Sequence, residues 1–588
     1  MKSNPPSTRV SETDPRLSVV LWTAAAMLLG FLGLVQLGVL LCLLTTRAAL
    51  PWVVPTALAV AVWLGDLLGR REGLRGQDRV WPIGSVLGWT LLAVGLSATF
   101  YDLSWDGQWY HQNAIYSMLQ GWNPLSEPLR AFSDHNQLWI RHYAKGPWYI
   151  GTAMAALTGQ VEAGKFQTWL TMGAAFAAVV AVCLEAGLRR PRALALGCVV
   201  AMNPVVMSEA LSFLVDGLMV CYLACYVAAL FSTLHRARPL TVFAGAAAAV
   251  GCINTKFTGL VLFCMFGAAA GLYYLIRRRD LLGRWVGWNL AAFVLGGAVF
   301  GYNPYVTNTI HRSHPFYPLA GSKAFPSLAE QGDDPIERFE TPPNMKGRPR
   351  LVRLGYAVFG RPGFSPYNDE PTARLMWPFA VHPRDLAVYR FHDVRIAGMG
   401  PFFSGGLVLA LILTVWLSLT PAVPRYLLLL GCGVLVATLL INVHLWWARY
   451  SPQMWWIPIL PAVVACWRSP SRWQGRLAWT LVGLLIVNTL IVAAVRLHWE
   501  VRATRTLHQQ LVSLRDSGRE IEIDLMHFGG SAGERLRAWG IPFEPARLGP
   551  WSEGELELMS VARGNPGGIR YRFKQTPPLS TGPEPAEG

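Results

Sequence analysis

Charged residues are scarce in this 588-residue chain. They make up 15% of the sequence, whereas hydrophobic residues make up 53%. Soluble domains contain roughly 25% charged residues, so the composition excludes an ordinary soluble protein and predicts an integral membrane protein. Cysteine is also scarce, because all nine cysteines lie inside apolar runs and no C-x-x-C pair is present. The sequence therefore indicates neither a disulfide framework nor a zinc site.

Motifs for metal binding and for hydrolysis are missing as well. No H-E-x-x-H or comparable ligand spacing occurs. We therefore expect no required cofactor, with a divalent cation held by outer His and Asp residues as the alternative. The segment Gly529–Gly533 fits the G-x-S-x-G pattern of a nucleophile elbow. No histidine follows Ser531, so we expect a glycine-rich turn into a helix there and not a hydrolase.

Long apolar runs are what the chain has in abundance. A helix that crosses a bilayer needs about 20 apolar residues, and runs of this kind predict about thirteen transmembrane helices. Their approximate ranges are 17–45, 50–69, 80–100, 163–187, 192–208, 214–233, 240–254, 258–276, 286–303, 399–420, 425–443, 452–467 and 477–495. The fifth, seventh and twelfth runs are short for a span.

Lys and Arg concentrate in alternate links between these runs. Cytoplasmic links are the ones enriched in Lys and Arg, so this bias places the N-terminus inside. The basic residues of the inner links are Arg70, Arg71, Arg75, Arg79, Arg189, Arg190, Arg192, Arg236, Arg238, Arg277, Arg278, Arg279, Arg284, Arg425, Arg468, Arg472 and Arg476. The short outer links hold little beyond Arg47, Lys256 and Arg449. The net charge of +16 therefore reflects membrane topology and not nucleic-acid binding.

This topology divides the chain into five predicted units. They are a cytoplasmic tail (1–16), an extra N-terminal helix pair (17–79), a membrane domain (80–497), a small outer α/β domain (498–573) and a disordered tail (574–588). Two long outer loops, 101–162 and 304–398, belong to the membrane domain. In the outer domain we expect a helix at about 503–516, a strand at 520–525 and a second helix at about 533–539.

Two carboxylates and an imidazole directly follow the third apolar run, at Asp102, Asp106 and His111. A charged cluster at the end of a membrane helix is costly unless it faces water, a partner or a substrate. The interleaved Trp105 and Trp109 suit a sugar ring, and a carboxylate can act as base for a hydroxyl within hydrogen-bond reach. Asp106 or Asp102 is therefore a candidate catalytic base. The alternative is a pair of solvated acids that mark the helix end.

Three more charged residues lie at other outer corners. Asp216 sits at the start of the sixth run, where it serves either a site or the helix macrodipole. Lys256 either binds a lipid phosphate or extends to the membrane interface. Arg449 carries a guanidinium whose geometry matches phosphate oxygens. Together, Lys256 and Arg449 could stabilise the charge of a departing lipid phosphate.

These outer corners resemble those of the GT-C superfamily of polytopic glycosyltransferases. The resemblance is closest to bacterial members related to protein mannosyltransferases and lipid A aminoarabinose transferase. It lies within residues 80–470 and is carried by Trp105–His111, Lys145–Gly146, Asn203–Pro204 with Asp216, Lys256–Gly259, Tyr302–Tyr305, His314–Pro318, Arg395–Gly400 and Arg449–Tyr450. The extra N-terminal helix pair and the C-terminal domain depart from the simplest family layout and leave the acceptor open.

The resemblance implies an all-α, GT-C-like membrane fold and an inverting glycosyltransferase. Such an enzyme takes a sugar from a polyprenyl-phosphate donor and passes it to a glycan, lipid or protein acceptor. Asp106 inherits the role of base by position, with Asp102 as the alternative. The implied substrate-binding residues are His111, Lys145, Asp216, Lys256, Arg449 and Tyr450. We expect a multi-pass protein of the inner cell membrane whose active site faces the outer, periplasmic side.

A transporter or flippase for a lipid-linked or anionic solute is the alternative function. It needs polar residues at mid-membrane on several spans, whereas the charged residues here gather at outer helix ends. A binding or assembly scaffold with an inactive site is the third possible function. Turnover of a lipid-linked sugar donor separates the enzyme from both.

Overall fold

The computed structural model describes most of the chain. The described residues are 15–45, 50–126, 134–234, 237–363, 372–421, 423, 425–468, 471–560 and 569–574. Most of the predicted cytoplasmic tail and the predicted disordered tail after residue 574 lie outside these ranges.

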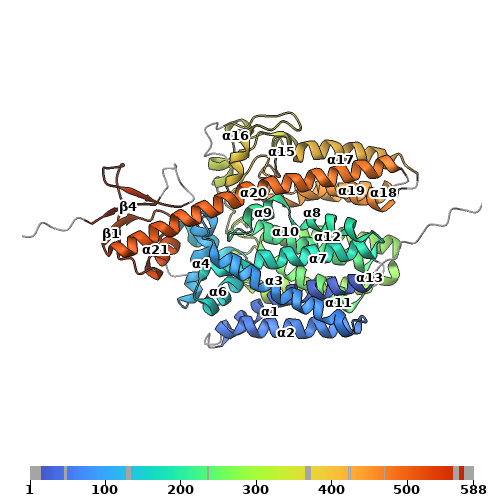
Figure 1. Cartoon of the computed structure of the whole chain (residues 1–588), viewed down its shortest axis with the longest axis horizontal. Coiled ribbons are helices and arrows are strands. Elements are labelled where there is room, and N and C mark those ends of the chain that lie inside the picture. Colours follow the sequence, from blue (N-terminus) through green and yellow to red (C-terminus); the bar gives the residue numbers. More distant parts are fainter. Residues whose placement is uncertain are drawn as a thin grey trace, which may run out of the picture.

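The first half of the chain is a bundle of helices (Figure 1). In chain order they are α1 (Pro15–Leu44), α2 (Leu50–Arg71), α3 (Val80–Thr99), α4 (Gln112–Leu119), α5 (Asp134–His142), α6 (Gly146–Thr158), α7 (Phe166–Glu185), α8 (Arg190–Ala201), α9 (Pro204–Glu209), α10 (Asp216–Thr233), α11 (Pro239–Thr255), α12 (Phe257–Arg277), α13 (Arg279–Val294) and α14 (Thr307–Arg312). Apolar runs become helices because a helix satisfies its own backbone hydrogen bonds. Helix α1 packs against α2, α7 and α11, so the predicted extra pair is joined to the bundle core.

The second half adds α15 (Arg350–Phe359), α16 (Pro383–Leu386), α17 (Phe403–Ser418), α18 (Arg425–Leu440), α19 (Trp456–Arg468), α20 (Arg472–Ser517) and α21 (Gly529–Ala538). Every predicted span falls on helical structure. However, only seven helices among the described residues are long and apolar enough to cross a membrane, or eight with one bent pair. The predicted number of thirteen is therefore not confirmed.

The fifth predicted span shows why the number differs. Residues 192–208 form two short helices, α8 and α9, because the chain turns at Asn203-Pro204. Proline cannot donate a backbone hydrogen bond and suits the first turn of a new helix. The Asn203 side chain caps α9 by accepting from the Val205 amide at 2.8 Å. The run is apolar, but it is not one continuous span.

A sharp bend of 80° separates the α13 segment from α14. It lies at Gly301–Asn303, where Asn303 has non-helical backbone angles. The Asn303 side chain accepts a hydrogen bond from Lys145 Nζ at 2.7 Å and donates to the Pro124 carbonyl. The bend is therefore fixed to the first outer loop by side-chain contacts.

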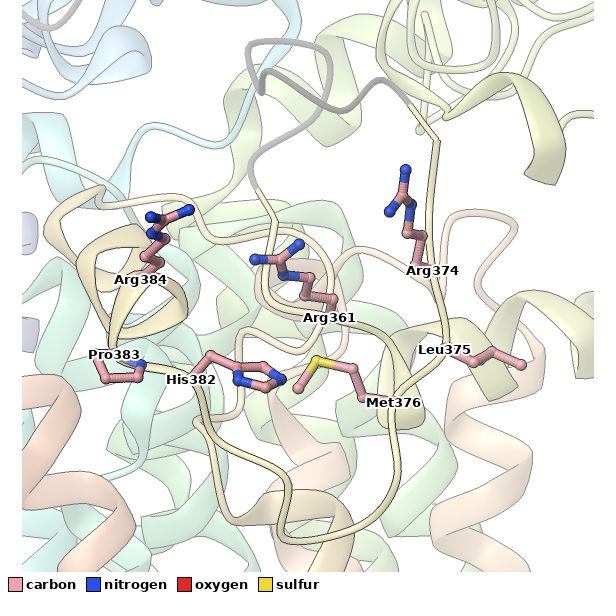
Figure 2. Close-up of a pocket in the computed structure, with 7 residues that line it drawn as sticks. All are labelled: Arg361, Arg374, Leu375, Met376, His382, Pro383 and Arg384. Carbon is pink, nitrogen blue, oxygen red and sulfur yellow. The ribbon is translucent and has the colours of Figure 1, made fainter.

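The second outer loop is built on short helices and ion pairs. Arg353 of α15 is buried and binds both carboxylate oxygens of Glu337, at 2.7 and 2.8 Å. The loop also lines an open pocket of about 530 Å³ (Figure 2). Arg361, Arg374 and Arg384 contribute to its lining, which contains none of the predicted site residues.

The C-terminal unit is carried by one helix. Helix α20 has 46 residues, which at 1.5 Å per residue gives a length of about 69 Å. The predicted helix at 503–516 is the C-terminal part of α20, which runs through residue 498 without a break. Figure 1 shows it leading from the bundle to a small sheet.

The sheet has four strands in the order β2-β1-β4-β3. They are β1 (Ile521–Asp524), β2 (Phe543–Pro545), β3 (Leu556–Leu558) and β4 (Ile569–Phe573). Strand β1 is parallel to β2 and antiparallel to β4. Helix α21 connects β1 to β2, as a parallel pair requires a crossover. The predicted strand at 520–525 and the helix that follows it are confirmed.

Candidate active site

Four predicted site residues converge on one cluster of ion pairs. Arg449 lies in a 3₁₀ turn, η9 (Ala448–Tyr450), and its Nη1 is 2.8 Å from Asp106 Oδ2 and 3.4 Å from Asp216 Oδ2. Lys256 Nζ lies 2.6 Å from Asp216 Oδ1. These side chains come from segments up to 343 residues apart. Each occupies a helix end or turn, which is why the chain can bring them together without placing charges at mid-helix.

Asp106 differs from the other acids in how its oxygens are used. Its Oδ2 is paired with Arg449, while its Oδ1 has no hydrogen bond or ion pair with any described residue. The Asp106 side chain is 16% exposed, whereas that of Asp216 is 1% exposed. Asp106 therefore combines a fixed orientation with a free, accessible oxygen, as proton transfer from a bound hydroxyl requires.

Asp393 is a member of the cluster that the sequence analysis missed. Its Oδ1 is 3.0 Å from Arg449 Nε and accepts a hydrogen bond from Trp447 Nε1. Its Oδ2 is 3.4 Å from Arg395 Nε. Arg449 consequently faces three carboxylates, from Asp106, Asp216 and Asp393. The motif Arg395–Gly400 begins two residues after Asp393, so a wider reading of that motif could have found it.

Aromatic rings form one wall of the cluster. The Tyr450 ring lies 4.2 Å from Lys256 Nζ and 4.9 Å from the Arg449 guanidinium. It stacks on Trp447 at 4.5 Å between ring centroids. Burial raises the pKa of Tyr450, so its phenol stays neutral. The predicted Tyr450 therefore contacts both cations of the cluster through its ring face.

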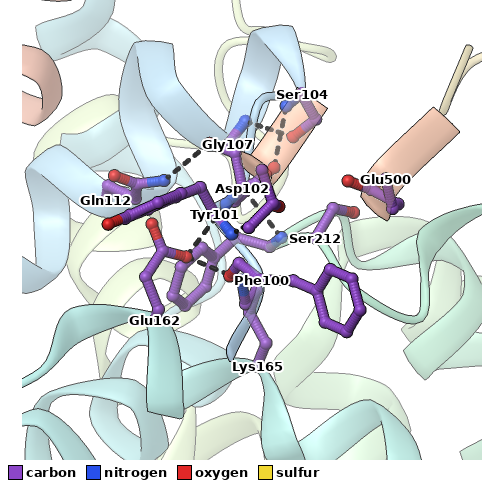
Figure 3. A network of polar contacts seen from close by, with 12 residues as sticks. Phe100, Tyr101, Asp102, Ser104, Gly107, Gln112, Glu162, Lys165, Ser212 and Glu500 are labelled. Carbon is purple, nitrogen blue, oxygen red and sulfur yellow. Dashed lines mark hydrogen bonds and ion pairs between the residues drawn. The ribbon is translucent and has the colours of Figure 1, made fainter. Parts of the chain in front are cut away.

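Asp102, the second predicted candidate for the base, does not join the cluster. It is fully buried, and its carboxylate accepts from the Ser104 amide at 2.8 Å and the Phe213 amide at 2.9 Å. Figure 3 shows this carboxylate enclosed by the turn that leads to Gly107. Burial raises the pKa of Asp102. Its oxygens hold the loop backbone and are not exposed to solvent.

His111 lies behind the cluster in the π-helical turn η2 (Gly107–His111). Its Nδ1 accepts a hydrogen bond from Trp148 Nε1 at 2.7 Å, which assigns the ring proton to Nε2. That Nε2 is buried and has no partner among the described residues. Burial, with Arg449 and Lys256 nearby, lowers the pKa of His111. It is thus a neutral donor, without a hydrogen bond or ion pair to the four charged residues.

Lys145 is a buried lysine surrounded by neutral groups. Its Nζ donates to the Arg141 carbonyl at 3.0 Å, the Tyr143 carbonyl at 2.9 Å and Asn303 Oδ1 at 2.7 Å. The residue is 1% exposed, and burial lowers the pKa of its ammonium group. Within the described part of the chain no carboxylate pairs with it. Lys145 is therefore separate from the Arg449 cluster, and no described carboxylate offsets the effect of burial on its ammonium group.

The described residues contain no group of three or more His, Cys, Asp or Glu side chains that could hold a metal ion. The carboxylates of the cluster bind Arg and Lys instead. The side chains of the cluster can provide proton transfer by a carboxylate and charge stabilisation by guanidinium and ammonium groups.

Comparison with known proteins gives little beyond these observations. The sequence matches no protein-family profile and no curated protein. Among solved structures, it is similar to ArnT from Cupriavidus metallidurans bound to undecaprenyl phosphate, at 15% sequence identity. The likeness covers 77% of this chain and 85% of that chain, with a TM-score of 0.36. A TM-score this low carries no functional conclusion, so any proposal rests on the residues described above.

Proposed function

We propose that this integral membrane protein is a glycosyltransferase. It moves a sugar from a polyprenyl-phosphate donor to a hydroxyl-bearing acceptor, a glycan, lipid or protein, at the outer face of the inner membrane. The supporting observation is the arrangement of Asp106, with one oxygen bound to Arg449 and the other free and accessible. The sequence resemblance to GT-C enzymes supports a polyprenyl-phosphate donor, because the motifs that carry it contain the residues of the Arg449 cluster.

In the proposed reaction Asp106 is the general base. Its free Oδ1 takes the proton of the acceptor hydroxyl while the hydroxyl oxygen bonds to C1 of the sugar. The bond between C1 and the phosphate oxygen breaks, and the lipid phosphate leaves with the electron pair. One displacement of this kind inverts the configuration at C1. General base catalysis contributes about 10²–10⁴-fold, so Arg449 must hold Asp106 firmly for the full effect.

The leaving phosphate needs a cation that is not already neutralised. Lys256 pairs with Asp216, and Arg449 faces three carboxylates. Lys145 has only neutral partners, and charge-assisted hydrogen bonds are roughly twice as strong as neutral ones. We therefore assign the lipid phosphate to Lys145, because a bound phosphate would offset the effect of burial on its pKa and favour the ammonium form. Its neighbour Trp148, 5.6 Å from Nζ, donates to His111 and so links it to the Asp106 loop.

A transporter or flippase of a lipid-linked or anionic solute is the second candidate. The 80° bend before α14 favours it, since transporters often bind their substrates at discontinuous helices. Solute counterflow in proteoliposomes, without any sugar transfer, would establish this function in place of the first.

The proposal is tested by incubating the purified protein in lipid nanodiscs with a panel of labelled undecaprenyl-phosphate hexoses and pentoses. A membrane extract supplies the acceptors. We expect one donor to lose its sugar to an acceptor, with inversion at C1 visible by NMR. If no donor reacts while the same protein shows solute counterflow in proteoliposomes, the proposal of a glycosyltransferase is refuted.

A further inference from the structure

The C-terminal unit packs directly on the loop that carries Asp106. Leu103 belongs to the apolar core of this unit. The Trp105 ring meets Phe528 edge-on, with 5.1 Å between centroids and an interplanar angle of 77°. Helix α21 contacts both α4 and the π-helical turn η2. The residues on either side of Asp106 are therefore part of an interface with a domain more than 400 positions later in the sequence.

Gly530 explains how closely α21 can approach. A Cβ added at Gly530 would lie 2.3 Å from Asn113 Oδ1, a separation that real Cβ atoms do not adopt. Any larger residue would therefore force the Asn113 side chain to move. The segment that resembled a nucleophile elbow is thus a docking surface against α4, and its serine faces the loop instead of solvent.

Ser531 makes the central polar contact of this interface. It is fully buried, and its Oγ donates to the Gln108 carbonyl at 2.7 Å. In an α-helix the Gln112 amide would bond to that carbonyl. In η2 the Gln112 amide bonds to the Gly107 carbonyl. The Gln108 carbonyl therefore loses its usual helical donor, and the hydroxyl from α21 takes that place.

A second contact from α21 fixes the other side of Asp106. Arg535 Nη2 lies 3.1 Å from Glu162 Oε1. Glu162 Oε2 accepts from the Asp102 amide at 3.0 Å and pairs with Lys165 at 2.7 Å. Figure 3 shows Glu162 and Lys165 beside the backbone at Asp102. Asp106 thus lies between two points, Asp102 and Gln108, that are both held by α21.

We infer that Ser531 is a positioning residue for the proposed base, acting through the Gln108 carbonyl to hold the π-helical turn that follows Asp106. The inference rests on the proposed function for its catalytic consequence. Short π-helical segments are uncommon and often occur at functional sites. A displacement of 1 Å at a reacting group can cost about 10²-fold in rate. A domain that fixes this turn therefore controls how Asp106 meets Arg449 and the acceptor.

The test compares Ser531→Ala with Ser560→Ala by hydrogen–deuterium exchange of the full-length protein in nanodiscs. Ser560 is a matched control, because it is buried in the same unit and its Oγ has no partner among the described residues. Losing one hydrogen bond worth about 1 kcal/mol corresponds to about fivefold faster exchange. We expect this increase at amides 107–113 in Ser531→Ala only, with α7 and α10 unchanged as a measure of folding.

Turnover of the undecaprenyl-phosphate sugar is measured on the same samples. We expect Ser531→Ala to lower kcat about tenfold or more at unchanged KM, because the base is misplaced while donor binding is kept. Gly530→Ala should act in the same direction. Unchanged exchange and unchanged kcat in Ser531→Ala would overturn the inference. Faster exchange at 107–113 in Ser531→Ala, together with a wild-type protein that transfers no sugar, would keep the docking contact and refute the proposed function instead.

Discussion

Replacing Arg449 by lysine keeps the positive charge but removes the geometry of the guanidinium. The Arg449 Nη1 pairs with Asp106 and Asp216, while a second nitrogen, Nε, pairs with Asp393. A lysine ammonium is a single point of charge and cannot reproduce contacts that leave two different nitrogens. The Arg449 side chain is 9% exposed, so water cannot replace a lost partner.

The size of the effect follows from these contacts. Losing one hydrogen bond to a charged group costs about 1.5–3 kcal/mol, so Arg449→Lys should lower the free energy of unfolding by about 2 kcal/mol. Arg449→Met leaves three carboxylates without the shared cation, and breaking a buried ion pair costs about 3–5 kcal/mol.

Unfolding in mixed micelles, followed by tryptophan fluorescence, measures these differences. Arg79→Lys is the matched control, since Arg79 binds Asp66 through two nitrogens with a side chain 33% exposed. Partly exposed pairs contribute about 0–1 kcal/mol. If Arg449→Lys changes the unfolding free energy no more than Arg79→Lys does, the cluster is not the tightly held unit described above.

Two further predictions concern the first outer loop. Gly107→Ala places a Cβ 1.9 Å from Asp102 Oδ2, so it should destabilise the protein by about 1–3 kcal/mol through overpacking. Gly84 has open space around it, so Gly84→Ala should not destabilise the protein. Thermal unfolding of both variants checks this. Burial lowers the pKa of His142 to about 4, so the unfolded chain binds more protons than the native one between about pH 4 and 6.5. Stability should therefore fall as the pH drops through that range, and His142→Gln should flatten the pH profile of the unfolding free energy.

The positions of the helices could be predicted from the sequence because apolar runs are a direct physical requirement of the membrane. Their lengths could not. Pro204 divides one run, and the bend at Asn303 depends on contacts with Lys145 that lie 158 residues away in sequence. Composition identifies where helices form, while breaks of this kind are decided by tertiary contacts.

Part of the candidate site could be predicted, because a charged residue at the end of a membrane helix is rare and therefore stands out in the sequence. Asp106, Asp216, Lys256 and Arg449 were selected for that reason, and they meet in the structure. Asp102 precedes Asp106 by only four positions, so no local pattern separates the two. The difference arises from the Phe213 amide, 111 residues away, which occupies one oxygen of Asp102.

Asp393 and Ser531 show a second kind of limit. Neither lies at the end of an apolar run, so scarcity of charge gave no signal for them. Asp393 is placed by Arg449 and Trp447, and Ser531 by the Gln108 carbonyl. These roles depend on contacts between residues that lie far apart in the sequence, which the pattern of charges does not predict.

The central claim is that Asp106 is the base for sugar transfer, and turnover by purified Asp106→Asn tests it most directly. The amide keeps an oxygen for Arg449 but cannot accept the acceptor's proton at neutral pH. Asp66→Asn in α2 is the matched control, because Asp66 also pairs with arginines but lies outside the cluster. We expect transfer from the undecaprenyl-phosphate donor to fall about 10²–10⁴-fold in Asp106→Asn and to stay near wild type in Asp66→Asn. Near-normal turnover in a folded Asp106→Asn protein would contradict the account.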